Sequence, residues 1–270
     1  MDGRQSTSFR CHQPEAPLRS AVVIPARIAS TRLPGKLLLR ETGMSVLEHT
    51  YRAACRAETP VGVWIAAGDD AIAGEARAIG APFRPTDPSA ASGTDRVAQV
   101  AAQLDDIDII VNVQADEPEI LPQQIDQVAR LLEEDDRSVM ATLAVPIRST
   151  RRLHDRACVK VVFDRQGRAL YFSRSPIPCV REWDDRLLDA DPPLFWQHLG
   201  IYAYRREFLL EIARLPQTPL EQLESLEQLR VLESGRSIRI GRTAHGPKGI
   251  DTAEDYRAFV ERCGTLRRSA

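Results

Sequence analysis

Short apolar runs and stretches of helical spacing alternate along the first half of the chain. Apolar runs of strand length predict buried strands over residues 21–24, 61–67 and 107–113, the first of which is expected to end at Pro25. Apolar positions at helical spacing predict helices over residues 45–54, 69–78 and 123–134, and over a segment that ends near Leu104. This alternation predicts right-handed βαβ units and a mostly parallel sheet covered by helices on both faces, an α/β fold.

The second half of the chain has a less regular pattern. Strands are predicted over residues 139–147, 159–163, 169–173, 199–204 and 237–242. A helix over residues 220–234 would carry Leu223, Leu226 and Leu229 on one side, and a closing helix over residues 252–263 would begin at Thr252. Four prolines and several charges over residues 176–193 predict an exposed excursion instead of a regular element.

The length and the patterns together predict one domain. A chain of 270 residues is within the range of a single α/β domain and needs no disulfide or structural metal to fold. We expect residues 19–270 to form this domain, interrupted by a dimerisation or lid excursion at about residues 148–193. Residues 1–18 are polar and lack the apolar stretch of a secretory signal, so we expect a disordered N-terminal extension.

Composition excludes several classes of function. The net charge of −2 argues against a nucleic-acid-binding surface, which requires clustered Lys and Arg. Apolar runs of only strand length exclude a membrane span. The five cysteines form no C-x-x-C pair, which predicts reduced thiols and a cytoplasmic protein. The five histidines show no zinc-ligand spacing.

The loop after the first predicted strand concentrates cations and hydroxyl groups. Residues 25–36 contain Arg27, Ser30, Arg32 and Lys36 and lie where ligands bind in open α/β sheets, beyond the carboxyl end of a strand. Positive charge and the backbone N–H groups of a tight turn are what a polyphosphate requires. The alternative is a solvated basic loop. Under either interpretation we expect Lys36 to be exposed and to add little to stability. The segment is not a P-loop, because Ser30 replaces the first glycine and no Ser or Thr follows Lys36.

Two acidic positions are candidates for metal binding. Asp116 and Glu117 end the third predicted strand, at the same edge of the sheet as the basic loop. Mg²⁺ prefers one or two carboxylates together with phosphate oxygens, so an acid here could hold a metal–triphosphate complex. The alternative is a pair of turn acids that favour the start of the next helix. Asp251 stands between Gly249 and the last predicted helix, where an acid is often only structural.

Nine sequence motifs resemble the 3-deoxy-manno-octulosonate cytidylyltransferases, also called CMP-Kdo synthetases. They are residues 24–27 (IPAR), 30–36 (STRLPGK), 92–96 (SGTDR), 112–118 (NVQADEP), 140–143 (MATL), 159–162 (VKVV), 170–174 (LYFSR), 198–202 (HLGIY) and 225–230 (SLEQLR). The resemblance runs in order from about Ala21 toward the C-terminus. It implies a three-layer α/β/α fold with a Rossmann-like sheet of the nucleotide-diphospho-sugar transferase type.

The resemblance also implies an activity and roles for individual residues. Such an enzyme transfers CMP from CTP to the anomeric hydroxyl of Kdo, an acidic sugar, for lipopolysaccharide or related glycan synthesis. The phosphates of CTP would be held by Arg27, Ser30, Arg32 and Lys36, and Mg²⁺ by Asp116 and Asp251; Lys36, Arg27 and Asp116 would be catalytic. The sugar acid would be surrounded by Arg96, Gln114, His198, Tyr202, Glu227 and Gln228.

Two positions depart from the family pattern, and two other functions remain to be separated. Ala115 stands where the family usually has glycine, and Ala253 where it usually has proline. A different acceptor, such as a sialic acid or a sugar phosphate, would use the same fold, and a catalytically silent nucleotide-binding protein would belong to another class. The resemblance also implies a homodimer. Four apolar residues of the excursion, for which we expect few local partners, could be covered by a second subunit: Ile177, Val180, Trp183 and Leu187.

Overall fold

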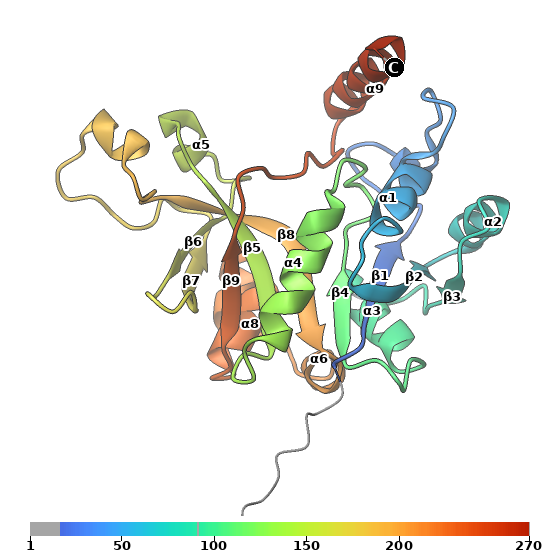
Figure 1. The fold of residues 1–270 in the computed structure, drawn as a ribbon, viewed down its shortest axis with the longest axis horizontal. Helices are drawn as coiled ribbons and strands as arrows, with labels where there is room; N and C mark the ends of the chain where they lie inside the picture. The colour runs from blue at the N-terminus through green and yellow to red at the C-terminus, as the bar shows by residue number, and fades with distance from the viewer. Residues whose placement is uncertain (1–16, 91, 270) are drawn as a thin grey trace, which may run out of the picture.

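The computed structural model describes residues 17–90 and 92–269, with side chains through residue 264 (Figure 1). All but the last two residues of the predicted N-terminal extension lie outside these ranges. No helix within the described ranges is long and apolar enough to cross a membrane.

The described strands form one mixed sheet, and most neighbours on its main path are parallel. In sheet order the main path is β3 (Phe83–Pro85), β2 (Pro60–Ala67), β1 (Ser20–Ala26), β4 (Ile109–Asn112), β8 (Trp196–Arg205), β5 (Met140–Pro146) and β9 (Ile238–Arg242). Strand β8 alone runs antiparallel to its neighbours β4 and β5. Strands β6 (Lys160–Phe163) and β7 (Ala169–Ser173) form a hairpin beside β8. The mostly parallel sheet expected from the sequence is therefore confirmed.

Helices cover both faces of this sheet, as the alternation of elements predicts. One face packs against α1 (Val46–Ala54), α2 (Asp70–Ala78), α4 (Pro122–Glu133) and α9 (Ala253–Ser269). The other packs against α3 (Gly93–Ala101), α6 (Arg206–Ile212) and α8 (Gln228–Glu233). Along β1, Val22 and Ile24 face the first layer and Ala21 and Val23 the second, the alternation of a strand buried on both sides. These layers make the three-layer α/β/α arrangement.

Pro25 does not end the first strand, contrary to the expectation from the sequence. It pairs with Ala66 of β2, and the strand continues to Ala26. Backbone groups of β1 alternate in direction: the Val23 carbonyl accepts a hydrogen bond from Val113 after β4, and the Ala26 carbonyl accepts one from Gly68 after β2. Pro25 therefore points toward β4, whose pairing with β1 stops at Val23. No neighbouring strand there requires the missing N–H group.

The helix predicted over residues 220–234 is two short helices, α7 (Pro219–Glu224) and α8. Ser225 separates them with a left-handed backbone conformation, φ 51° and ψ 53°. Arg174 explains the break, because its guanidinium group donates to the carbonyls of Glu224 and Ser225 at 2.7 and 3.2 Å. Leu223, expected on the buried side, is 82% exposed, whereas Leu226 and Leu229 are buried.

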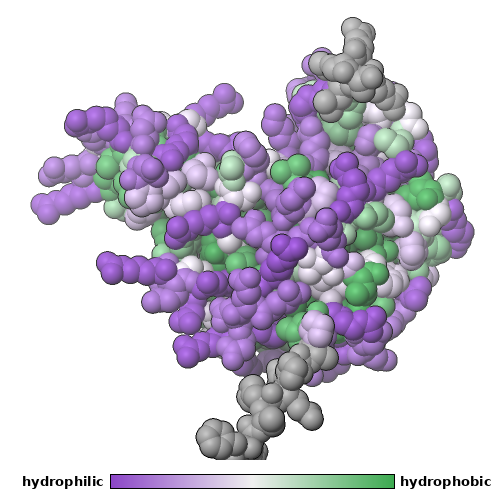
Figure 2. All heavy atoms as spheres, viewed as in Figure 1, coloured by the Kyte–Doolittle hydropathy of each residue, from purple (hydrophilic) through white to green (hydrophobic). Residues whose placement is uncertain are grey.

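The excursion has a small apolar core of its own. The excursion contains helix α5 (Thr150–His154) and the 3₁₀-helix η2 (Asp185–Asp189), and it projects from one end of the sheet (Figure 1). The buried members of this core are Ile147, Leu153, Cys158, Leu188 and Phe195. Val180 and Leu187 pack against this core, so the expectation that these two residues lack local partners is wrong, while Trp183 is 42% exposed. Figure 2 shows a hollow between the excursion and the rest of the molecule, on a face that is largely hydrophilic.

Lys160 fixes the base of the excursion. Its side chain is fully buried, and its ammonium group donates to the carbonyls of Asp155, Cys158 and Arg174 at 3.0, 2.6 and 2.5 Å. One cation thus joins the turn before β6 to the end of β7. A buried charge is tolerated here because each of its three donors has an acceptor.

We expect Lys160→Met to lower the free energy of unfolding by about 3 kcal/mol or more, because it leaves three buried carbonyls without a donor. Urea unfolding measures the change. Lys248→Met, at an exposed lysine, is the matched control and should change stability by less than about 0.5 kcal/mol. A similar small change in both variants would contradict this role of Lys160.

Candidate active site

A cleft of about 700 Å³ lies at the carboxyl ends of β1 and β4. The loop after β1 supplies its cations, and the segment after β4 supplies its acids. It brings together all six residues predicted to bind nucleotide or metal, with two of those predicted to bind sugar: Arg27, Ser30, Arg32, Lys36, Arg96, Gln114, Asp116 and Asp251. The predicted placement of the basic loop at the ligand-binding edge is confirmed.

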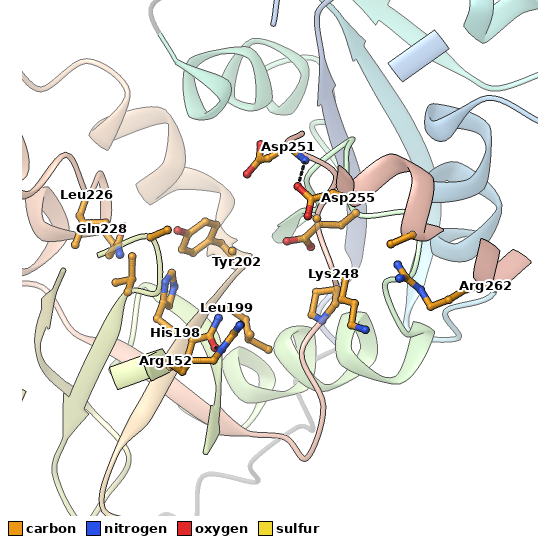
Figure 3. A pocket seen from close by; sticks show the side chains of 18 residues that line it. Arg152, His198, Leu199, Tyr202, Leu226, Gln228, Lys248, Asp251, Asp255 and Arg262 are labelled. Atoms are coloured by element: carbon orange, nitrogen blue, oxygen red, sulfur yellow. Dashed lines mark hydrogen bonds between the residues drawn. The ribbon is translucent and has the colours of Figure 1, made fainter. Parts of the chain in front are cut away.

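A second cavity, of about 660 Å³, adjoins the cleft, and Asp251 lines both. His198, Tyr202 and Gln228 line this cavity (Figure 3). Six of its other lining residues are Glu117, Arg152, Gln197, Lys248, Asp255 and Arg262. The two chambers therefore meet near Asp251.

The six residues expected around the sugar acid are not all in one chamber. Arg96 and Gln114 line the cleft, and Glu227 lines neither chamber. Glu227 accepts a hydrogen bond from Thr94 at the start of α3, and burial raises the pKa of its carboxyl. Gln114 lies between the chambers, with its side-chain amide 3.4 Å from the Gly200 carbonyl.

The cationic loop is held in shape by its own turns and by α2. The backbone N–H of Ile28 donates to Asp69, the N-cap of α2, at 2.6 Å. Gly35 has a φ of 67°, a conformation that favours glycine, and begins the 3₁₀-helix η1 (Lys36–Leu38). This turn directs Lys36 toward the acids at the end of β4 and before α9.

Lys36 joins the two candidate metal-binding acids. Its ammonium group lies 2.5 Å from the Asp116 carboxylate, 3.1 Å from that of Asp251 and 2.6 Å from the Ile250 carbonyl. Arg32 pairs with Asp251 at 2.8 Å. The expectation of an exposed lysine is wrong, since only 12% of the Lys36 side chain is accessible. The acids come from distant parts of the sequence, so their closeness was not visible in the local pattern.

Asp251 reaches Asp116 through backbone contacts. The Ile250 N–H donates to the Asp116 carbonyl at 2.9 Å, which places the segment before α9 against the end of β4. Asp255 accepts hydrogen bonds from the backbone N–H groups of Asp251 and Thr252, as in an N-capping arrangement. The predicted cap at Thr252 is confirmed.

The two departures from the family pattern are accommodated. Ala115 is buried, and its carbonyl accepts a hydrogen bond from Thr50 at 2.9 Å. Ala253 is the first residue of α9. Proline is favoured at this position because its N–H has no partner within the helix, and alanine also forms helix readily.

Arg96 supports the wall of the cleft. It is 3% exposed, and its guanidinium group donates to the carbonyls of Asp87, Pro88 and Ala90 at 2.8, 3.4 and 3.4 Å. A Cβ atom at Gly68 would lie 2.8 Å from the Arg96 Nη1 atom, so Gly68 provides room for this group. Much of the hydrogen-bonding capacity of Arg96 therefore holds the loop before α3.

His198 is buried as a neutral imidazole with a defined tautomer. The Thr142 hydroxyl lies 2.7 Å from the Ile201 carbonyl and 3.0 Å from the Leu199 carbonyl, so its proton points toward these acceptors. His198 Nε2, 3.1 Å from the same hydroxyl, then carries a proton and donates it. Burial lowers the pKa of His198 to about 3. Nδ1 is left as an acceptor beside the second cavity, a useful partner for a substrate hydroxyl.

This histidine should make stability fall in acid. Below the unfolded pKa of 6.5, the unfolded chain binds a proton at this histidine, whereas the folded protein does not bind it until about pH 3. This difference leaves the free energy of unfolding nearly unchanged above pH 6.5 and lowers it progressively as the pH falls below 6.5. Between pH 7 and pH 5 the loss should be about 2 kcal/mol. His198→Asn should show a correspondingly flatter dependence in urea unfolding at several pH values, and His154→Asn, on the surface of α5, should not. Equal slopes in wild type and His198→Asn would contradict the assignment.

Sequence reasoning gave no role to several residues of the second cavity. Arg152 lies on α5, which was not predicted, and donates to Gln197 at 2.6 Å. Arg262, on α9, pairs with Glu119 at 2.5 Å. Glu117 adjoins Asp116 within residues 112–118, and this position was the one feature of the sequence that could have indicated a functional role for it. Burial and the nearby carboxylates of Asp116 and Asp251 raise the pKa of Glu117 to about 8.

Comparisons with known proteins agree with this architecture. A family model described as cytidylyltransferase matches residues 21–238. A 3-deoxy-manno-octulosonate cytidylyltransferase of Rhodopirellula baltica is 47% identical over 246 residues, which cover 91% of this chain and 98% of the relative. Another from Geobacter metallireducens is 44% identical over 249 residues, with coverage of 91% and 98%.

Solved structures support the same assignment. The structure of a CMP:2-keto-3-deoxy-manno-octonic acid synthetase complexed with CTP aligns with a TM-score of 0.82 and 35% identity, over 93% of this chain and all of the other. A cytidylyltransferase from Leptospira borgpetersenii aligns with a TM-score of 0.58 at 18% identity, over 90% of this chain and 85% of the other, and shows the shared fold alone. The chain therefore belongs to the 3-deoxy-manno-octulosonate cytidylyltransferase family.

Proposed function

We propose that this protein transfers CMP from CTP to the anomeric hydroxyl of Kdo, giving CMP-Kdo and pyrophosphate. The observation that carries the proposal is the pair of adjoining chambers, one cationic and one lined by hydroxyl-binding groups, which share Asp251. The relatives named for this activity are similar over nearly their whole length. A relative solved with CTP has the same fold.

In this proposal the first chamber binds the triphosphate of CTP. Arg27, Ser30, Arg32 and Lys36 line it, and their cations and hydroxyl group match the charge and oxygens of phosphate. Arg32 and Lys36 already pair with carboxylates in this structure. A bound triphosphate would compete for both cations, so we expect nucleotide binding to loosen these ion pairs.

Mg²⁺ is part of the proposal, with Asp116 and Asp251 as its ligands. Their carboxylates and the Ile250 carbonyl surround one cation, the ammonium group of Lys36, which is an oxygen-only environment of the kind Mg²⁺ prefers. No group of three or more His, Cys, Asp or Glu side chains suited to a metal occurs among the described residues, so phosphate oxygens would have to complete the site. When bound, the metal would neutralise phosphate charge and acidify the attacking hydroxyl.

The reaction requires no covalent enzyme intermediate. The anomeric oxygen of Kdo forms a bond to the α-phosphorus of CTP, the bond to pyrophosphate breaks, and the hydroxyl proton is lost. The protein contributes position and charge: Arg27, Arg32 and Lys36 stabilise the phosphate oxygens while the second chamber orients the sugar.

Two other functions can be separated from this one by a panel of acceptors. With CTP and Mg²⁺ present, pyrophosphate release should depend strongly on Kdo and only weakly on a sialic acid or a sugar phosphate. Preference for one of these other acceptors would indicate a different transferase on the same fold. Absence of pyrophosphate release with every acceptor, in a protein that still binds CTP, would favour a silent nucleotide-binding protein.

We also propose a cytoplasmic homodimer, with the excursion as the region that contacts the partner. Trp183 and Leu194 are exposed on it, at 42% and 47%, and Leu170 is 61% exposed on β7 beside it. Apolar groups of this size are candidates for a symmetric contact that uses the same surface on both subunits. The alternative is a lid that closes over the sugar within one chain.

Light scattering across the micromolar range should therefore give twice the chain mass of 30.1 kDa. Trp183→Glu should shift the protein toward the monomer, because it places a charge in the proposed contact. Glu207→Gln, at an exposed residue of α6, should leave the mass unchanged. A mass of one chain at all concentrations would contradict the dimer and favour the lid.

A further inference from the structure

Two polar atoms in the wall of the second cavity have no hydrogen-bond partner among the described residues. They are the Oε2 atom of Glu117 and the Nε2 atom of Gln228, and both residues line the cavity. Gln228 is only 3% exposed. A buried donor or acceptor that lacks a partner costs free energy in the folded state, so such groups mark places where a ligand supplies the missing contact.

The two atoms have opposite hydrogen-bonding roles. The amide nitrogen of Gln228 donates, and a carboxyl oxygen of Glu117 accepts. A sugar hydroxyl can do both, so a polyhydroxylated ligand satisfies this pair better than a phosphate, which has only acceptors at its oxygens.

Glu117 is held in a defined position. It lies in the turn after β4 and against β8, where a Cβ atom added to Gly200 would be 3.6 Å from the Oε1 atom of Glu117. Its backbone N–H donates to the Gln114 carbonyl at 3.2 Å, and its own carbonyl accepts from Ile120 at 3.1 Å. A side chain that packs against a strand from a hydrogen-bonded turn contributes to specificity, because little freedom is lost when the ligand binds.

Figure 3 shows the surroundings of such a ligand. Tyr202, His198 and Gln228 lie on one side of the cavity, and Lys248 and Arg262 lie across from them. Arg152, beside His198, adds a third cation, so positive charge suited to a carboxylate is present on both sides of the cavity. Together with the uncharged hydrogen-bonding groups, which suit hydroxyls, these cations match a molecule that carries both an acid and hydroxyl groups.

We infer that Glu117 is a specificity-determining residue whose carboxyl group accepts a hydrogen bond from a hydroxyl group of the sugar acid, opposite the amide donor of Gln228. The inference rests on the proposed function. It assigns a role to a residue that the basic loop, the two candidate metal ligands and the other sugar-side residues leave without one.

Steady-state kinetics with Glu117→Gln tests the inference. The variant keeps the shape of the side chain but replaces one carboxyl oxygen with an NH₂ group, which donates and cannot accept, so KM for Kdo should rise by about tenfold to a hundredfold. KM for CTP and the Mg²⁺ concentration for half-maximal rate should stay within about twofold of wild type. Glu207→Gln, at an exposed residue of α6, is the matched control and should change none of the three.

Two results would overturn the role of Glu117. An unchanged KM for Kdo would remove it from the sugar site, and an increased Mg²⁺ requirement would make it part of the metal site. A wild-type protein that releases no pyrophosphate with CTP, Mg²⁺ and Kdo would instead refute the proposed function, so the two failures are distinguishable.

Monodeoxy derivatives of Kdo provide a test on the wild-type protein, independent of whether the variant folds. The derivative that lacks the contacted hydroxyl should have a raised KM with wild type, and Glu117→Gln should add little further loss for it. Unchanged KM values for every monodeoxy derivative with the wild-type protein would contradict the inference.

Discussion

Replacing Asp116 with asparagine should lower turnover by about a thousandfold or more, equivalent to about 4 kcal/mol of transition-state stabilisation. Asp116 lies in the turn after β4 and pairs with Lys36, so its carboxylate is central to the cationic cleft. An amide has nearly the same shape but carries no charge with which to hold a metal ion. The fold should be retained, because the Asp116 side chain is 28% exposed and its backbone contacts are unchanged.

Initial rates at saturating CTP, Kdo and Mg²⁺, together with circular dichroism, measure this effect. Asp105→Asn is a matched control, since Asp105 is an exposed acid that pairs with Arg206. It should retain turnover within about twofold of wild type. Activity of Asp116→Asn within a few-fold of wild type at saturating Mg²⁺ would refute the assignment of Asp116 as a metal ligand.

Replacing Lys36 with methionine should lower turnover by about a hundredfold or more, because a positive charge that neutralises phosphate in the transition state is lost. The change should also destabilise the protein, by about 1–2 kcal/mol, since the Asp116 and Asp251 carboxylates would face each other without their shared cation. This loss is larger than expected for a solvated lysine, and it follows from the partial burial of the ion pairs.

The two effects of Lys36→Met have separate measurements. Rates at saturating CTP report on the transition state, and urea unfolding without nucleotide reports on the ion pairs. Lys36→Arg keeps the charge, so it should recover most of the stability while turnover stays low, because the guanidinium group has a different reach and shape. Lowered stability with unchanged turnover in Lys36→Met would indicate that Lys36 has only a structural role.

The sequence was sufficient for the layers of the fold and for the edge of the sheet that holds the site. An apolar run followed by cations, as in residues 21–36, has few interpretations in an α/β chain, because the carboxyl ends of parallel strands meet at one edge. Asp116 was found in the same way. The place of Asp251 in the cleft could not be predicted from a local pattern. It depends on a backbone hydrogen bond between Ile250 and Asp116, which are far apart in the sequence.

Tertiary contacts explain why some of the predictions from the sequence were wrong. The apolar spacing of residues 220–234 is that of a helix, but Arg174 binds the carbonyls of Glu224 and Ser225 and the chain turns there. Lys36 was expected to be solvated because its acidic partners come from other parts of the chain. The tautomer of His198 depends on Thr142, on a neighbouring strand. Hydrophobic periodicity carries none of this information.

The identity of the product tests the central claim most directly. Purified protein should be incubated with CTP, Kdo and Mg²⁺, and the phosphorus-containing species followed by ³¹P NMR. The account predicts loss of CTP with the appearance, in equal amounts, of pyrophosphate and one phosphodiester that joins CMP to Kdo, and no reaction when Kdo is omitted. Release of pyrophosphate without Kdo, or formation of CMP without the phosphodiester, would contradict it.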